Sequence, residues 1–170
     1  MHKLLRAVDA ANRASARASS WLILVIVGAL VYEVVARYGF RKPTMWSFDV
    51  TYMACSLFVA FGLGYTLQTR GHVLVDVVYN RLSQRTRSLI YVVMYLVLFF
   101  PCWVLLIHSM LPYVIRSWMW KERATTGTWL PPVYPFKAWV LIGVTLFALQ
   151  GLAEFVRNVY LLCGREVTKQ

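Results

Sequence analysis

The chain has 170 residues, of which 59% are hydrophobic and 15% charged, and its mean hydropathy is +0.57. This composition excludes an ordinary soluble domain of this length and indicates an integral membrane protein. The net charge of +11 comes from 18 Lys and Arg against 7 Asp and Glu. These basic residues flank apolar runs instead of clustering on a soluble face, which argues against nucleic-acid binding.

Residues 1–20 are rich in Ala and Ser and carry four basic residues against one acid, Asp9. We expect a short amphipathic or frayed cytoplasmic lead. A basic start before an apolar run also resembles a secretory signal, but no small-residue cleavage pattern follows the run. We therefore expect the first apolar helix to be retained.

Four charge-free stretches, 18–32, 50–69, 88–115 and 138–153, are candidates for membrane spans, since about 20 apolar residues cross a bilayer. The first and last reach that length only if an acid and a base near the helix end pair with each other. Glu33 with Arg37, and Glu154 with Arg157, have the required spacing. The sequence thus predicts an all-α membrane protein of one domain, 1–170, with spans at about 18–38, 48–69, 88–111 and 137–161.

Polar residues at the span ends have a structural and a functional interpretation. The Glu33–Arg37 pair either keeps the helix end neutral or forms a proton-relay or subunit contact. Trp46 and Asp49 open the second span, where Asp49 either contacts a partner or favours the helix macrodipole. Gln150, beside Gly151 in the last span, suits a hydrogen bond between closely packed helices. Pro101 predicts a kink in the third span.

Between the second and third spans, Gly71 precedes a stretch whose apolar and polar residues separate onto two helical faces. We expect an amphipathic segment on the membrane surface, with Arg70, Gly71, His72 and Asp76 forming either an elbow or a contact with another subunit. A metal site at His72 and Asp76 would need further ligands. Cys55, Cys102 and Cys163 have no paired spacing and predict neither disulfide nor metal cluster.

Orientation follows from the basic residues, which are enriched on the cytoplasmic side of membrane proteins. With the N-terminus inside, eleven of the 18 Lys and Arg are cytoplasmic. The other seven are Arg37, Arg41, Lys42, Arg116, Lys121, Arg123 and Lys137. This excess predicts that both termini are cytoplasmic and that the aromatic loop between the third and fourth spans faces outward.

Several short motifs, in this order, resemble the small membrane subunit of tripartite ATP-independent periplasmic (TRAP) transporters. They are Arg37-Tyr38, Trp46 with Asp49, the stretch Arg70-Gly71-His72 through Asp76, and Leu149-Gln150 with Glu154-Phe155. The similarity covers almost the whole chain, and the Arg-Gly-His-x-x-x-Asp segment is its most specific part. Glu122, Thr125 and Thr126 before Trp129 match the outer-loop pattern of that family only approximately.

The resemblance implies a non-enzymatic subunit of the bacterial inner membrane, with no cofactor of its own. Its partners would be a large membrane subunit, which holds the substrate and sodium sites, and a periplasmic solute-binding protein that delivers an organic acid. The small subunit would enlarge the static scaffold of the large one.

Two other classes compete with this interpretation. A small four-helix protein can anchor haem or quinone in a redox complex, and His72 and His108 are the candidate haem ligands near spans. The predicted topology places them at opposite ends of spans, so they cannot bind one iron. A stand-alone transporter is disfavoured because the predicted spans contain few polar groups.

Overall fold

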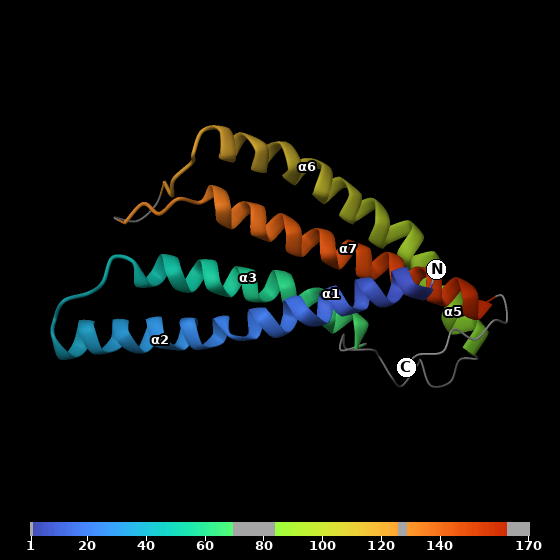
Figure 1. The fold of residues 1–170 in the computed structure, drawn as a ribbon, viewed down its shortest axis with the longest axis horizontal. Helices are drawn as coiled ribbons and strands as arrows, with labels where there is room; N and C mark the ends of the chain where they lie inside the picture. The colour runs from blue at the N-terminus through green and yellow to red at the C-terminus, as the bar shows by residue number, and fades with distance from the viewer. Residues whose placement is uncertain (1, 70–83, 126–128, 163–170) are drawn as a thin grey trace.

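The computed structural model of the chain describes residues 2–69, 84–125 and 129–162, and these residues form helices joined by short loops (Figure 1). The predicted all-α class is confirmed. The elements are α1 (His2–Ser20), α2 (Leu22–Val34), the π-helical turn η1 (Val35–Gly39), α3 (Ser47–Gln68), α5 (Gln84–Met94), the π-helical turn η2 (Tyr95–Phe99), α6 (Phe100–Met119) and α7 (Tyr134–Leu162).

Within the described residues, four helical spans are long and apolar enough to cross a membrane. They are Lys3–Gly39, Ser47–Gln68, Ser88–Met119 and Tyr134–Leu162, numbered here one to four. The second and fourth differ from the predicted bounds by a few residues at most. The first is much longer than its predicted range of 18–38, and the third extends eight residues beyond its predicted end at residue 111.

The first span continues through the region expected to be a short or frayed lead. Its 37 residues would extend about 55 Å at 1.5 Å per residue, well beyond a hydrocarbon core of about 30 Å. Because the exposed Arg13 and Arg17 favour a position outside the hydrocarbon, we assign the membrane-crossing part to α2. The end of the layer that carries α1 is called the inner end, and the opposite end the outer end, after the orientation predicted from the basic residues.

The third span ends at Met119 instead of residue 111, because residues 112–119 continue the helix. His108, expected at the outer end of this span, therefore lies eleven residues before its end. Near Pro101, where a kink was predicted, η2 interrupts the α-helical pattern directly before the proline. Pro101 has no N–H to donate, so a change of hydrogen-bonding register at this point is physically reasonable.

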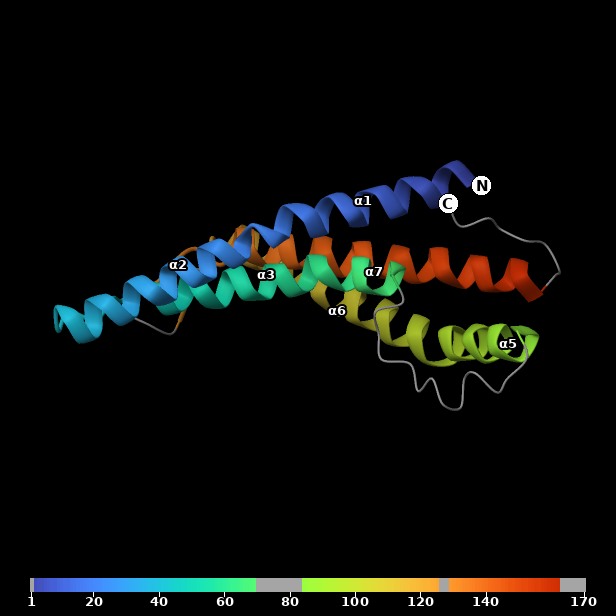
Figure 2. The same ribbon diagram turned by 90° about the horizontal axis from the view of Figure 1, so that it is seen from below.

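The four spans lie side by side in one layer, in the order α6, α7, α3, α2 (Figure 1). Seen edge-on, α1 crosses one broad face of this layer and contacts the inner halves of α3 and α7 (Figure 2). The helix α5 contacts α7 as well. Consequently α3 and α7 are the two central helices, and α2 and α6 form the two edges.

Small residues bring the central helices close together. Gly143 of α7 packs directly against Ala60 of α3, and Gly151 lies under the ring of Phe99. Burial is also greatest in the centre of the layer. In the most apolar stretch of α7, 39% of the residues are buried, whereas no residue is buried in the most apolar stretch of the third span. The layer therefore leaves large apolar surfaces on its edges and faces.

Replacing Gly143 with Ala is expected to weaken the contact between α3 and α7. A Cβ at this position would lie 2.9 Å from the Cβ of Ala60 and 3.0 Å from its carbonyl carbon, so the helices would have to move apart. Overpacking of this kind costs roughly 1–3 kcal/mol. We expect a lower Tm in a fixed detergent.

Gly62→Ala is the matched control, because Gly62 is also in a central helix and no atom lies within 4 Å of its Cβ position. Alanine favours a helix by up to about 1 kcal/mol relative to glycine, so the Tm should stay or rise. An equal loss of Tm in both variants would contradict the packing argument.

Candidate functional site

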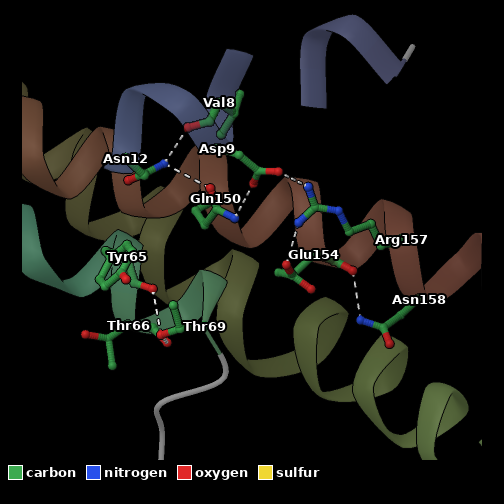
Figure 3. Close-up of polar contacts among 10 residues, drawn as sticks. All are labelled: Val8, Asp9, Asn12, Tyr65, Thr66, Thr69, Gln150, Glu154, Arg157 and Asn158. Atoms are coloured by element: carbon green, nitrogen blue, oxygen red, sulfur yellow. Dashed lines mark hydrogen bonds and ion pairs between the residues drawn. The ribbon is translucent and has the colours of Figure 1, made fainter. Parts of the chain in front are cut away.

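The inner ends of α1 and α7 are joined by a group of buried or half-buried polar side chains, here called the inner polar cluster (Figure 3). It consists of Asp9 and Asn12 from α1 with Gln150, Glu154, Arg157 and Asn158 from α7. Helical spacing places the four α7 residues on one side of that helix. That side is covered by α1, so side chains that would be costly in lipid find partners within the chain.

Gln150 is fully buried and uses both ends of its amide to hold α1. Its Oε1 accepts from Asn12 Nδ2 at 3.0 Å, and its Nε2 donates to Asp9 Oδ1 at 2.9 Å. The helix-to-helix hydrogen bond expected from Gln150 is thus present. Gly151 itself lies against the ring of Phe99, so the glycine contact and the hydrogen bonds of Gln150 involve different helices.

Arg157 joins two carboxylates from different helices. Its Nη2 pairs with Asp9 of α1, and its Nη1 donates to Glu154 Oε1 at 2.5 Å. The predicted Glu154–Arg157 pair is therefore one arm of a larger bridge. The backbone carbonyl of Glu154 also accepts from Asn158 Nδ2 at 2.8 Å.

Asn12 fits into a gap that exists only because position 64 is glycine. Its Oδ1 would lie 1.9 Å from a Cβ at Gly64 of α3, so any larger residue there would collide with it. Asn12 Nδ2 also donates to the carbonyl of Val8 at 3.1 Å. A single α1 residue thereby contacts both central helices, and the cluster fixes the N-terminal helix to the layer.

At the outer end, Glu33 organises the loop between η1 and α3. Its Oε1 accepts from Arg37 Nη2 at 2.5 Å, and its Oε2 accepts from the backbone N–H of Thr44 at 2.9 Å and from the Thr44 hydroxyl. Ser47 then donates to the carbonyl of Ala29 at 2.8 Å. This geometry fits the structural interpretation of the Glu33–Arg37 pair.

Trp46 and Asp49 lie at the start of α3 in different surroundings. The Trp46 ring packs against Tyr32 with a centroid distance of 5.5 Å, and α3 has no side-chain hydrogen bond at its N-cap. Asp49 lies in the first turn, as expected for an acid at a helix N-terminus. Its Oδ2 is nevertheless buried without a hydrogen-bond partner in the described part of the chain.

Asp49 borders a cavity of about 400 Å³ between the start of α3 and the outer loop. The loop is held there by Lys137 Nζ, which lies 2.6 Å from Glu122 Oε2 and 3.9 Å from the centre of the Tyr113 ring. The hydrogen bond from Lys137 lowers the pKa of Glu122 below its ordinary value. Backbone hydrogen bonds between residues 122–124 and 131–133 also join the two ends of this loop.

Other sequence candidates fall outside the structure's coverage. Arg70, Gly71, His72 and Asp76 lie outside the described residues, so the elbow and contact hypotheses remain predictions. Within residues 2–69, 84–125 and 129–162, no three His, Cys, Asp or Glu side chains are grouped to hold a metal ion. Cys55 and Cys102 are free and exposed.

Sequence reasoning did not identify Asp9 and Asn12 as partners of α7. A usable signal was present, because Asp9, Asn12, Ala16 and Ser19 recur at spacings of three and four residues. A stripe of small and polar residues with this period is typical of close helix contacts in membranes. The basic residues on the other faces of α1 concealed it.

A single layer of apolar helices, with paired polar groups at its two ends, defines a small multi-pass membrane protein. The sequence matches the family described as tripartite ATP-independent periplasmic transporters, DctQ component, over residues 26–160. The chain belongs to this family, and it is the small membrane subunit of a TRAP transporter of the inner membrane. No curated protein and no solved structure matches the chain.

Arg157→Met should release α1 from the layer. The substitution keeps an apolar chain of similar length but leaves the carboxylates of Asp9 and Glu154 without their cation. Removing one partner of a buried ion pair costs about 3–5 kcal/mol, and we expect the lower end because Arg157 lies near the inner boundary. A lower Tm and faster hydrogen exchange in α1 would be measured in the same detergent.

Arg13→Met is the control, since Arg13 is exposed on α1 and forms no ion pair with any described residue. It should change the Tm and the exchange of α1 little. If both variants gave the same exchange rates in α1, the inner polar cluster would not be what holds this helix.

Proposed function

We propose that the chain is a non-catalytic scaffold for the large membrane subunit of its transporter. The observation that carries this proposal is the single layer of helices, which leaves many of its large apolar side chains exposed. A self-contained bundle would bury one side of every helix against the others. An open layer instead suits addition to the side of a larger membrane protein.

The placement of polar groups supports a scaffold rather than a pathway. Transport routes usually contain several polar groups near the middle of the membrane, commonly at broken helices. In the described residues, the buried ionic groups gather at the two ends of the layer, and the inner ones are engaged in mutual bonds. On this proposal, the large subunit carries the substrate and sodium sites.

The transported solute would be an organic acid, delivered by a periplasmic solute-binding protein and taken up with sodium. No cofactor is proposed for this chain. Its outer loop would face the binding protein, and both termini would be cytoplasmic. Support for this orientation comes from the basic residues and from the four spans, which return the end of α7 to the side on which α1 begins (Figure 1).

Labelling of single cysteines should verify the orientation. We expect Ala10→Cys to be reached only from the cytoplasm and Thr125→Cys only from outside, in a background without Cys55, Cys102 and Cys163. Both positions are exposed, so burial does not limit the reaction. A membrane-impermeant maleimide applied to intact cells and to opened vesicles distinguishes the two sides. Labelling of position 10 in intact cells would show that the orientation is the opposite of the one proposed.

Reconstitution should test the scaffold role. We expect this chain to co-purify with the large subunit, and we expect uptake in proteoliposomes only when that subunit and the solute-binding protein are present. The chain alone should show none, because it offers no polar route across the layer. Uptake of an organic acid down a sodium gradient by the single chain would refute the scaffold proposal.

A further inference from the structure

The outward side of α6 carries polar groups midway along its length. His108 and Ser109 are exposed on this edge helix, close to the exposed Cys102 and Pro112. Because Pro112 has no N–H, the backbone carbonyl of His108 loses the donor that a helix normally supplies four residues later. His108 therefore presents both an imidazole and a carbonyl to its surroundings.

These groups lie at the depth of the hydrocarbon. The nearest charged residue toward the outer side is Arg116, eight residues or about 12 Å further along the helix. Toward the inner side, the charge-free stretch begins at residue 88, about 30 Å away. The outer interface is marked by Trp118 and Trp120, which lie beyond Arg116.

Neither side chain has a partner within the described residues. By contrast, the hydroxyls of Ser56, Thr66 and Thr145 each donate to a backbone carbonyl four residues earlier in their own helix. An unsatisfied hydrogen-bonding group in hydrocarbon is costly, and ionisable residues in spans usually face protein rather than lipid. The α6 edge is therefore poorly suited to lipid at this depth.

The opposite edge of the layer has a different character. From Leu22 to Val31, α2 contains only apolar residues and glycine. Its exposed side chains include Leu24, at 63%, which nearly equals the 64% of Leu105 on α6. The two edges expose similar apolar surface, but only α6 adds hydrogen-bonding groups in mid-span.

We propose that the α6 edge around His108 is the intramembrane surface that packs against the large subunit. The partner would be a transmembrane helix that presents a carboxylate or amide to the His108 imidazole, and the α2 edge would face lipid. This inference rests on the proposed scaffold function and specifies which surface performs it.

Site-specific photo-crosslinking tests the choice of edge. Benzoylphenylalanine is placed at Leu105 or at Leu24, in cells that express this chain together with the large subunit of its transporter. We expect an adduct with the large subunit from position 105 at a yield at least tenfold above that from position 24. Equal yields, a higher yield from position 24, or no adduct from either position would overturn the proposal.

Substitution of His108 tests the polar contact. His108→Leu should lower the yield of co-purified large subunit by about threefold to tenfold, the range expected for one hydrogen bond between membrane helices. Leucine suits lipid, so the Tm of the isolated chain should not fall. His108→Gln keeps hydrogen-bonding capacity and should retain most of the complex. Full co-purification with His108→Leu would overturn the contact.

The outcomes separate this inference from the scaffold proposal itself. If the unmodified chain co-purifies with the large subunit but position 105 gives no adduct, the scaffold function stands and the α6 surface is wrong. If the unmodified chain never co-purifies with the large subunit, both fail.

Discussion

The approach of α3 to α7 at Ala60 and Gly143 is the contact on which the layer depends. Lipid is as apolar as these side chains, so no hydrophobic force drives the helices together, and close packing must do so. Glycine allows the backbones to meet, and the other helices attach to this pair. Since α2 joins on the α3 side and α5 and α6 join on the α7 side, the chain forms a layer rather than a bundle.

Hydrogen bonds then fix the positions of helices that could otherwise slide along one another on apolar contacts alone. Inner and outer polar groups lie at opposite ends of the layer, where partial hydration lowers the cost of charge. Gln150 and Arg157 attach α1, and Glu33 holds the first outer loop. The middle of the layer is thereby left to apolar contacts, with His108 as an exception that needs an external partner.

The sequence predicted those features that depend on composition and short spacing. Charge-free stretches located the four spans, and the spacing of Glu33 with Arg37 indicated their ion pair. Helix lengths were missed in α1, which continues beyond the hydrocarbon, and after residue 111, because hydropathy does not report where the helix itself ends. The partners of Gln150 were also missed. The spacing of Asp9 and Asn12 indicates a contact face on α1, but contacts across 138 and 141 residues leave no local signal that pairs this face with α7.

These long-range contacts have a consequence for biogenesis. Asp9 and Asn12 leave the ribosome long before their partners Gln150 and Arg157, which follow 138 to 148 residues later in the chain. Until α7 has been inserted, the polar face of α1 has only water or lipid headgroups to bind. Its basic residues can hold it at the anionic membrane surface during this interval. Closure of the inner polar cluster therefore requires the insertion of α7, and a product truncated before α7 would expose that face to cellular quality control.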